Sequence, residues 1–369
     1  CFILNQKSFS VNLLYLAPMF FLIPSAVNTL GNFQNGIYEA EKLSLYFFGI
    51  CVGTAGFREK DFFYAVFLVG MLVSFFGLAA YFGIVPAEEF VFFDRGISRL
   101  QSFVKYANTA ACLLGVGYIS LMYIYSINGK KEYFVSGILI FTALILTFSK
   151  AFIPIFMLIC LLVVLKNDNL RTFFLIQFLI SAFCAAAAAV SVKLNVKIFG
   201  FIVFMAVIPL SVKLSEVKFK NPLKILCSFY AAGALLFALL IISKPELGLT
   251  FEKRLIYSKD ALKLFFARPF FGCGPGSWEV LQFGVQSMQY SVKYMHNGIL
   301  QLFVECGAFF GILFFGGIAY AAYLTFKEKK YFMFAVIAAI IIHSFFDFDL
   351  SFSLMLLILG IATGLAAHN

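Results

Sequence analysis

The sequence contains little charge. Asp, Glu, Lys and Arg make up 12% of its 369 residues, whereas 62% are hydrophobic and 19% aromatic. A soluble domain of this length would carry about twice as much charge, so the composition excludes an ordinary soluble protein. The apolar runs also lack the alternation of polar and apolar residues that a membrane β-barrel needs in segments of about 10. Because only helices and closed barrels satisfy their backbone in lipid, the sequence predicts an all-α, polytopic membrane protein.

Paired cysteines and a cleavable signal peptide are also missing. The eight cysteines have no metal-binding spacing, and those inside apolar runs are interpreted as small hydrophobic residues. Cys273 alone lies in a polar stretch, where little supports a role as a nucleophile. The chain begins with Cys1 rather than Met, so we expect an N-terminal piece to precede it; no signal peptide is visible.

Long apolar runs predict about twelve membrane-spanning helices within a single integral membrane domain, residues 1–369. The predicted spans are 11–30, 43–57, 62–85, 107–127, 133–149, 151–165, 172–192, 198–212, 225–243, 298–326, 331–346 and 351–367. Several are shorter than the roughly 20 residues that a crossing requires, so they extend into their flanks or are re-entrant.

Lysine and arginine are distributed unevenly over the connections. One set of alternate connections carries 14 of them: Lys7, Arg58, Lys60, Lys130, Lys131, Lys166, Arg171, Lys213, Lys218, Lys220, Lys224, Lys327, Lys329 and Lys330. The opposite set, without the long 244–297 loop, carries 7: Lys42, Arg95, Arg99, Lys105, Lys150, Lys193 and Lys197. The positive-inside rule then predicts cytoplasmic termini and an extracytoplasmic 244–297 loop. The net charge of +10 follows from this bias and does not indicate nucleic-acid binding.

The main polar stretch is residues 254–305, which read RLIYSKDALKLFFARPFFGCGPGSWEVLQFGVQSMQYSVKYMHNGILQLFVE. It holds Arg254, Arg268, a Gly-Pro-Gly turn and His296, the only histidine outside the last 27 residues. A polar loop with Arg and His between membrane spans indicates chemistry on a charged substrate at the bilayer surface. We therefore predict that residues 244–297 form an extracytoplasmic catalytic loop.

Part of this loop has the pattern of an amphipathic helix. Residues 255–266 place Leu255, Leu262, Phe265 and Phe266 near one helical face, with the lysines elsewhere. Such a helix lies on the membrane surface, so we expect the loop to be partly helical and to rest on the bilayer.

Four polar clusters fall on the outer face in this topology. They are RLQSFVKYANTAA at 99–111, FSK at 148–150, the long loop, and HSFFDFDLS at 343–351. We expect them to converge, because an outward-facing catalytic site needs that arrangement.

These clusters resemble the signature of the O-antigen ligase and polymerase superfamily of bacterial membrane glycosyltransferases. The run ALKLFFARPFFGCGPGSW, followed by MHNGILQLFVECG, is similar to the family's loop with an Arg, a glycine-rich turn and a downstream His-Asn pair. RLQSFVKYANTAA and IIHSFFDFDLS resemble two further family elements, and all four stand in the right order between about 99 and 351. Members usually have Ser-Arg where this chain has Ser149-Lys150; lysine keeps the charge but loses the bidentate fork.

The resemblance implies an enzyme of the cytoplasmic membrane with its active site facing outward. It would move a glycan from a polyprenyl-diphosphate donor to a hydroxyl of a lipid or polysaccharide acceptor. Neither metal nor cofactor is implied, and we expect no Asp-x-Asp metal site in the predicted outer loops. The partners are this donor, this acceptor and membrane lipids. Cations stabilise the departing diphosphate, and a histidine accepts the hydroxyl proton near neutral pH.

The resemblance assigns roles to nine residues. The catalytic residues would be His296, Arg268 and Arg254. The diphosphate or glycan would be bound by Lys150, Arg99 and Asn297. Supporting residues would be Glu305, Gly274 and Gly276.

Simpler interpretations stand beside these roles. His296 alternatively caps the helix that begins near Asn297, and the arginines and Lys150 alternatively anchor the chain at lipid headgroups. The glycines alternatively only shape a turn, while Asn297 and Glu305 orient His296 or pack the helix. A further set is interpreted as structural: His343, Asp347 and Asp349 as a polar cluster, and Trp278 with the tyrosines as an aromatic belt.

Two other functions remain open. A polymerase would use the same loop chemistry with a different acceptor, so the sequence does not separate it from a ligase. A transporter or flippase for a polyprenyl-linked sugar would also place Arg beside a lipid phosphate. Transporters typically show internal repeats and broken helices near the midplane, and the sequence shows no clear repeat between its halves.

Overall fold

The computed structural model describes residues 13–27, 29–94, 96–130, 132–217, 219–243 and 246–367. Four residues of the charge count, Lys7, Arg95, Lys131 and Lys218, lie outside this range. The described residues are helical apart from short connections and one β-hairpin, which confirms the predicted all-α class. The hairpin itself was not predicted.

The chain divides into two compact parts, and each is described by itself. The terminal part comprises Cys1–Glu59 and Ala234–Asn369, and the central part comprises Lys60–Gly233. The terminal part contains α1 (Leu13–Leu16), α2 (Pro18–Val27), α3 (Phe33–Thr54), α11 (Glu246–Ala267), α12 (Trp278–Val285), α13 (Gly298–Lys327), α14 (Tyr331–Ser344), a 3₁₀ turn (Asp349–Ser351) and α15 (Ser353–Ala367). The central part contains α4 (Glu59–Tyr81), β1 (Val91–Asp94), β2 (Ile97–Leu100), a 3₁₀ turn (Ser102–Val104), α5 (Ala107–Asn128), α6 (Glu132–Leu146), α7 (Phe152–Lys166), α8 (Asn169–Lys193) and α9 (Lys197–Leu214), while α10 (Pro222–Ser243) runs from the central into the terminal part.

Every predicted span except 11–30 overlaps one α-helix, because long apolar runs leave the backbone no other way to satisfy its hydrogen bonds in lipid. Within the part of the chain that the structure describes, five helices are long and apolar enough to cross a membrane: α4, α5, α8, α9 and α13. Helices α2, α6, α7, α14 and α15 are apolar but shorter. These apolar helices mark the chain as membrane-embedded, whereas the count of twelve spans stays a prediction.

Two predicted boundaries are wrong. The span predicted at 43–57 belongs to α3, which begins at Phe33 because the Asn32 side chain accepts hydrogen bonds from the backbone N–H groups of Gln34 and Asn35. The span predicted at 11–30 is divided between α1 and α2, and Pro18 opens the second helix. Proline suits a first helical turn because its missing N–H is not needed there.

The hairpin of the central part carries one predicted site residue. β1 and β2 pair in antiparallel register, with Phe92 opposite Arg99. Behind them, α5 is the most buried of the long helices, and Gly70 of α4 approaches it closely, since a Cβ on Gly70 would lie 3.0 Å from the Cα of Gly117. Arg99 is therefore held at a rigid edge beside α5.

In the terminal part, glycines bring α3 and α15 into close contact. A Cβ on Gly49 would lie 2.7 Å from the carbonyl oxygen of Leu357, and a Cβ on Gly53 would lie 2.5 Å from that of Ile361. Gly360 is in equally tight contact with the backbone of α3. Small residues four apart on both helices are a common device of membrane helix pairs, and here they fix α3 beside the segment that precedes α15.

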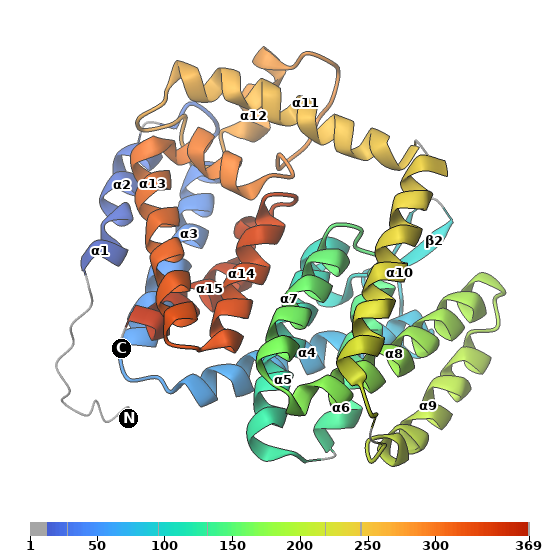
Figure 1. The fold of residues 1–369 in the computed structure, drawn as a ribbon. Coiled ribbons are helices and arrows are strands. Elements are labelled where there is room, and N and C mark those ends of the chain that lie inside the picture. The colour runs from blue at the N-terminus through green and yellow to red at the C-terminus, as the bar shows by residue number, and fades with distance from the viewer. Residues whose placement is uncertain are drawn as a thin grey trace. The chain divides into compact units, whose positions relative to one another are not determined.

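The polar loop folds over the end of this bundle at which α13 begins, where α11 and α12 lie across the other helices (Figure 1). The prediction of a partly helical loop is thus confirmed. Its own core consists of Tyr257, Ala261, Trp278, Met295 and Val304. Trp278 is fully buried there, so the aromatic-belt interpretation is wrong for this residue.

The amphipathic prediction holds for most of the helical face. Leu255, Leu262 and Phe266 of α11 are exposed, whereas Tyr257 and Ala261 on the opposite face are buried. The exposed apolar side chains fit the predicted contact with lipid, which stays a prediction.

A buried carboxylate ties the loop together. Asp260 accepts hydrogen bonds from the backbone of Ser287 at 2.8 Å, from the Tyr290 hydroxyl at 2.9 Å and from Lys263 at 2.7 Å. Burial opposes ionisation of Asp260, but these hydrogen bonds outweigh it and lower the pKa of its carboxyl. The carboxylate is therefore part of the folded loop at neutral pH.

The glycine-rich turn enters a break in α13. Gly307 interrupts this helix with φ 81° and ψ 174°, a conformation that only glycine adopts without strain. Cys273 N–H donates to the carbonyl of Val304 at 3.0 Å, and Gly274 N–H donates to that of Glu305 at 2.8 Å. On the other side of the break, Ala308 N–H donates to the Pro269 carbonyl at 2.7 Å. The turn thus satisfies backbone groups that the break exposes.

Candidate functional site

His296 stands at the junction of the loop and α13. It has a positive φ of 55°, a region that histidine enters more often than most residues. The N-cap of α13 is the next residue, since the Asn297 side chain accepts a hydrogen bond from Leu300 N–H at 3.0 Å. The capping interpretation therefore applies to Asn297 and not to His296.

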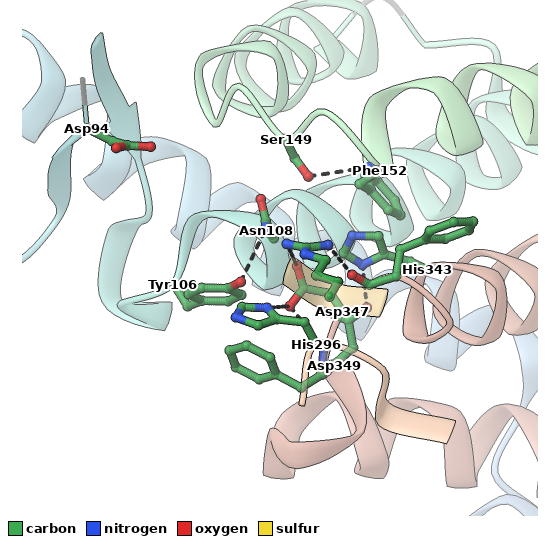
Figure 2. A network of polar contacts seen from close by, with 12 residues as sticks. Asp94, Tyr106, Asn108, Ser149, Phe152, His296, His343, Asp347 and Asp349 are labelled. Carbon is green, nitrogen blue, oxygen red and sulfur yellow. Dashed lines mark hydrogen bonds and ion pairs between the residues drawn. The ribbon is translucent and has the colours of Figure 1, made fainter. Parts of the chain in front are cut away.

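The imidazole of His296 contacts a buried carboxylate. Its Nδ1 lies 3.3 Å from Oδ1 of Asp347 (Figure 2), and the Asp347 side chain is fully buried. The same oxygen accepts a hydrogen bond from Phe348 N–H at 3.0 Å, and the carbonyl of Asp347 accepts one from Gly298 N–H at 2.9 Å. The residues flanking His296 are thus bound directly to the turn between α14 and α15.

Arg254 of α11 completes this group. Its Nη2 lies 3.4 Å from Oδ2 of Asp347, and its Nη1 donates to the carbonyl of Phe346. Burial opposes ionisation of Asp347, but the hydrogen bond with His296 and the charges of His296 and Arg254 outweigh it, so the pKa of Asp347 lies well below its usual range. Asp347 is therefore an anion between a cation and an imidazole.

Aromatic rings fix the plane of the His296 ring. Phe348 meets it edge-on, with ring centroids 5.0 Å apart, and Tyr257 of α11 lies roughly parallel to it at 6.5 Å. With Nδ1 facing a carboxylate that only accepts, the neutral ring carries its proton on Nδ1 and its basic lone pair on Nε2. This is the arrangement of a histidine oriented as a general base.

A second histidine–carboxylate pair lies next to the first. His343 Nδ1 lies 2.5 Å from Oδ2 of Asp349, and both side chains are fully buried (Figure 2). Asp347 and Asp349 thus have an Asp-x-Asp spacing, so the expectation that the predicted outer loops contain no such pair is wrong. In the fold the two carboxylates contact different histidines, and Asp347 accepts from Arg254 as well.

Asp347 was interpreted as part of a structural polar cluster with His343 and Asp349, and the structure shows that it also contacts His296 and Arg254. A signal was present, because a carboxylate beside apolar spans needs a partner. The partner itself lies 51 residues away and depends on the fold of the turn.

Arg268 follows the end of α11, and its side chain is exposed. Among the described residues it has no ion pair or side-chain hydrogen bond. Unlike Arg254, it has its guanidinium donors available for an anionic ligand, which matches either the diphosphate or the headgroup interpretation.

The residues predicted as supporting shape the loop. Glu305 is 4% exposed, and its Oε1 accepts from Trp278 N–H and from the Gln301 amide, both at 3.3 Å. Gly274 and Gly276 have φ values of 100° and 69°, so their role as turn-shaping residues follows from the backbone. In the part of the chain that the structure describes, none of the three contacts His296, and they act by holding the turn in place.

Arg99 and Lys150 lie near each other within the central part. Arg99 Nε donates to the carbonyl of Thr147 at 2.9 Å, and its Nη2 donates to Oδ1 of Asn108 at 2.7 Å. Asn108 in turn donates to the Tyr106 hydroxyl at 3.1 Å (Figure 2). Lys150 is exposed in the turn that begins at Thr147. Arg99 thus braces the turn that presents Lys150, while convergence of all four predicted clusters stays a prediction.

Cys273 is not suited to nucleophilic chemistry. Its side chain is 1% exposed, and burial raises the pKa of the thiol, so the reactive thiolate is disfavoured.

An apolar cavity of about 300 Å³ lies between α13 and α14. Its lining runs from Ile299 and Phe345, close in sequence to His296 and Asp347, to Phe315 and Ala322 farther along α13. His296, Asp347 and Arg254 do not line this cavity, and its apolar lining suits the apolar part of a ligand.

No protein-family model, curated protein or solved structure matches the chain. Its function is therefore proposed from the motifs and from the geometry of the site.

Proposed function

We propose that this chain is a metal-independent glycosyltransferase of the O-antigen ligase type. It moves a glycan from a polyprenyl-diphosphate donor to a hydroxyl of a lipid or polysaccharide acceptor. In this proposal the chain crosses the cytoplasmic membrane about twelve times, and residues 244–297 and the site face outward. The observation that carries the proposal is the contact of Asp347 with both His296 and Arg254. The segments of His296 and Asp347 are two of those that carry the family resemblance, and Arg254 belongs to the predicted polar loop.

The proposed reaction is a direct displacement at the anomeric carbon. The acceptor hydroxyl oxygen forms a bond to that carbon while the bond from the carbon to the diphosphate oxygen breaks. His296 Nε2 takes the hydroxyl proton, and Asp347 stabilises the imidazolium that forms at 3.3 Å. The bonding pair of the broken bond leaves with the polyprenyl diphosphate.

The arginines divide the electrostatic work. Arg268, exposed and without a partner among the described side chains, is proposed to hold the diphosphate, because its planar guanidinium binds phosphate oxygens in pairs. Arg254 keeps Asp347 ionised through its 3.4 Å contact and adds positive charge near the leaving group. Lys150, Arg99 and Asn297 remain candidates for contact with the donor.

The apolar cavity between α13 and α14 supports a lipid-linked donor over a soluble nucleotide sugar. A water-soluble donor would have no apolar part to occupy this cavity. In this proposal the lipid part of the donor occupies the cavity.

A flippase for a polyprenyl-linked sugar is the second candidate, and the break of α13 at Gly307 is the observation that favours it. Broken helices are typical of transporters, in which freed carbonyls bind ions or substrate. Here the carbonyls of Val304 and Glu305 already accept from Cys273 and Gly274, so the break seats the loop. This occupancy favours the transferase.

The experiment is a transfer assay with the purified protein in lipid nanodiscs. A synthetic polyprenyl-diphosphate oligosaccharide is supplied with a hydroxyl-bearing lipid or glycan acceptor, and the product and released polyprenyl diphosphate are measured by mass spectrometry. Equal amounts of both products are expected from the ligase or polymerase, and the productive acceptor distinguishes the two. Movement of a labelled donor across vesicles without any transfer would instead establish the flippase.

A further inference from the structure

Lys42 of α3 is a buried lysine outside the group formed by His296, Asp347 and Arg254. Its side chain is 9% exposed, and it lies on a helix that packs closely against α15. Lysine is rarely buried unless it is paired, and charges within membrane proteins tend to mark functional regions. The contacts of its ammonium group therefore need an explanation.

Three acceptors surround this ammonium group. Glu39 Oε2 lies 2.5 Å from Nζ, the Tyr294 hydroxyl 3.2 Å and the carbonyl of Ser351 3.2 Å. The Tyr294 hydroxyl in turn donates a hydrogen bond to Glu39 Oε1 at 3.2 Å. Because an ammonium has three protons, these contacts use all of its donors and leave none for a substrate.

Two of the three acceptors belong to the segments that form the site. Tyr294 precedes His296 by two residues, and Ser351 follows Asp347 by four. Between them, Phe348 stacks on the Tyr294 ring at 4.8 Å and meets the His296 ring at 5.0 Å. Lys42 thus joins, from a third helix, the two chain segments whose alignment sets the contact of His296 with Asp347.

The space beside Lys42 does not admit a substrate. A small cavity lined by Glu39, Lys42, Gln301, Glu305 and Ser351 has room for about one water molecule. A sugar or a diphosphate is far larger. The group around Lys42 therefore acts on the site only through the segments that it holds.

We propose that Lys42 is a positioning residue of the transfer reaction, an inference that rests on the proposed function. Its ammonium fixes the segment of His296 against the segment of Asp347, and Glu39 holds that ammonium in place. Loss of these contacts lets the imidazole leave the carboxylate, so that His296 becomes a less well oriented base. Donor binding does not depend on Lys42.

A double-mutant cycle tests this role. Lys42→Met keeps the length of the side chain and removes the charge. It should lower kcat by about 10-fold, as for other residues that orient a functional histidine, with the donor KM unchanged. In the Asp347→Asn background, where the contact with His296 is already altered, Lys42→Met should lower kcat little further. An equal loss in both backgrounds, or no loss in the wild-type background, would overturn the proposal.

Hydrogen exchange gives a readout that does not need activity. Lys42→Met should speed amide exchange in residues 294–300 and 345–352, whereas Lys60→Met, at an exposed position at the start of α4, should not. Unchanged exchange in both segments would refute the claim that Lys42 joins them, even if activity fell. If the wild-type protein transferred no glycan, the proposed function would fail, and exchange would still decide whether Lys42 joins the two segments.

Lys42→Met leaves the buried carboxylate of Glu39 without its partner, and this unpaired charge can cause misfolding. Misfolding must be separated from the proposed loss of positioning. Glu39→Gln combined with Lys42→Met removes both charges and supplies the second variant. It should fold, as judged by thermal unfolding, and show the same loss of kcat as Lys42→Met. Wild-type kcat in this folded double variant would refute the positioning role.

Discussion

Replacement of Asp347 by asparagine perturbs the site at its most connected side chain. The carboxylate is fully buried and contacts His296 at 3.3 Å and Arg254 at 3.4 Å. Asparagine keeps the size of the side chain but removes its charge. An amide also presents an NH₂ group, so it is able to bind the opposite tautomer of His296, in which Nδ1 carries the lone pair.

The expected loss follows from these contacts. A hydrogen bond to a charged group contributes about 1.5–3 kcal/mol. Only the contact with His296 strengthens as the ring takes up the acceptor proton, so this amount is lost from the transition state. It corresponds to about 10- to 150-fold in kcat, and a shift of tautomer lowers kcat further.

Steady-state transfer in nanodiscs measures this loss. The donor KM should change little, because the proposed mechanism gives Asp347 no contact with the donor. Asp168→Asn is the matched control, since Asp168 forms an exposed ion pair with Arg171 at 2.6 Å and such pairs contribute about 0–1 kcal/mol. Wild-type kcat in a folded Asp347→Asn protein would refute the claim that Asp347 orients the base.

Three further outcomes are expected. Arg268→Lys should weaken binding of the polyprenyl-diphosphate donor in a donor titration, and Arg254→Lys should mainly lower kcat in the transfer assay. Unchanged values in both variants would favour the interpretation of these residues as headgroup anchors. Gly360→Leu should lower the free energy of unfolding by at least about 2 kcal/mol in thermal melts, because its side chain would press on the backbone of α3, whereas Gly316→Ala, with open space around it, should not. Because folding lowers the pKa of Asp260, its carboxylate stabilises the loop above the unfolded pKa of about 3.9, and this stabilisation is lost as pH falls through the lower folded pKa. Protease cleavage of the loop should therefore rise on acidification of the wild type, and Asp260→Asn should be cleaved readily at neutral pH.

Helix positions are predictable from this sequence because apolar runs have few alternatives in lipid. The start of α3 was missed because it is polar, with Glu39, Glu41 and Lys42 on its first turns. Two of these charges are buried against each other, and a composition window does not show a pair that depends on tertiary contacts. The tight contact of α3 with α15 likewise depends on glycines about 310 residues apart, whose pairing no local pattern reveals.

Site residues that belong to a sequence motif were predictable, whereas residues that reach the site only through tertiary contacts were not. Motif resemblance indicated His296, the polarity of the loop indicated Arg254, and in the structure both contact one carboxylate. Asp347 itself was interpreted as structural, because its partner is set by the turn after α14. Lys42 was counted only as a topological charge, although its ammonium reaches Tyr294 and Ser351. Both residues act across sequence distances that only the folded terminal part closes.

Transfer by His296→Ala, measured beside donor binding, tests the central claim most directly. A positioned general base contributes about 10² to 10⁴ in rate, so glycan transfer should fall by this factor while binding of the polyprenyl-diphosphate donor is retained. Added imidazole should restore part of the rate, because the truncated side chain leaves room at a site where His296 is 25% exposed. Wild-type transfer by the folded His296→Ala protein would contradict the assignment and favour the flippase.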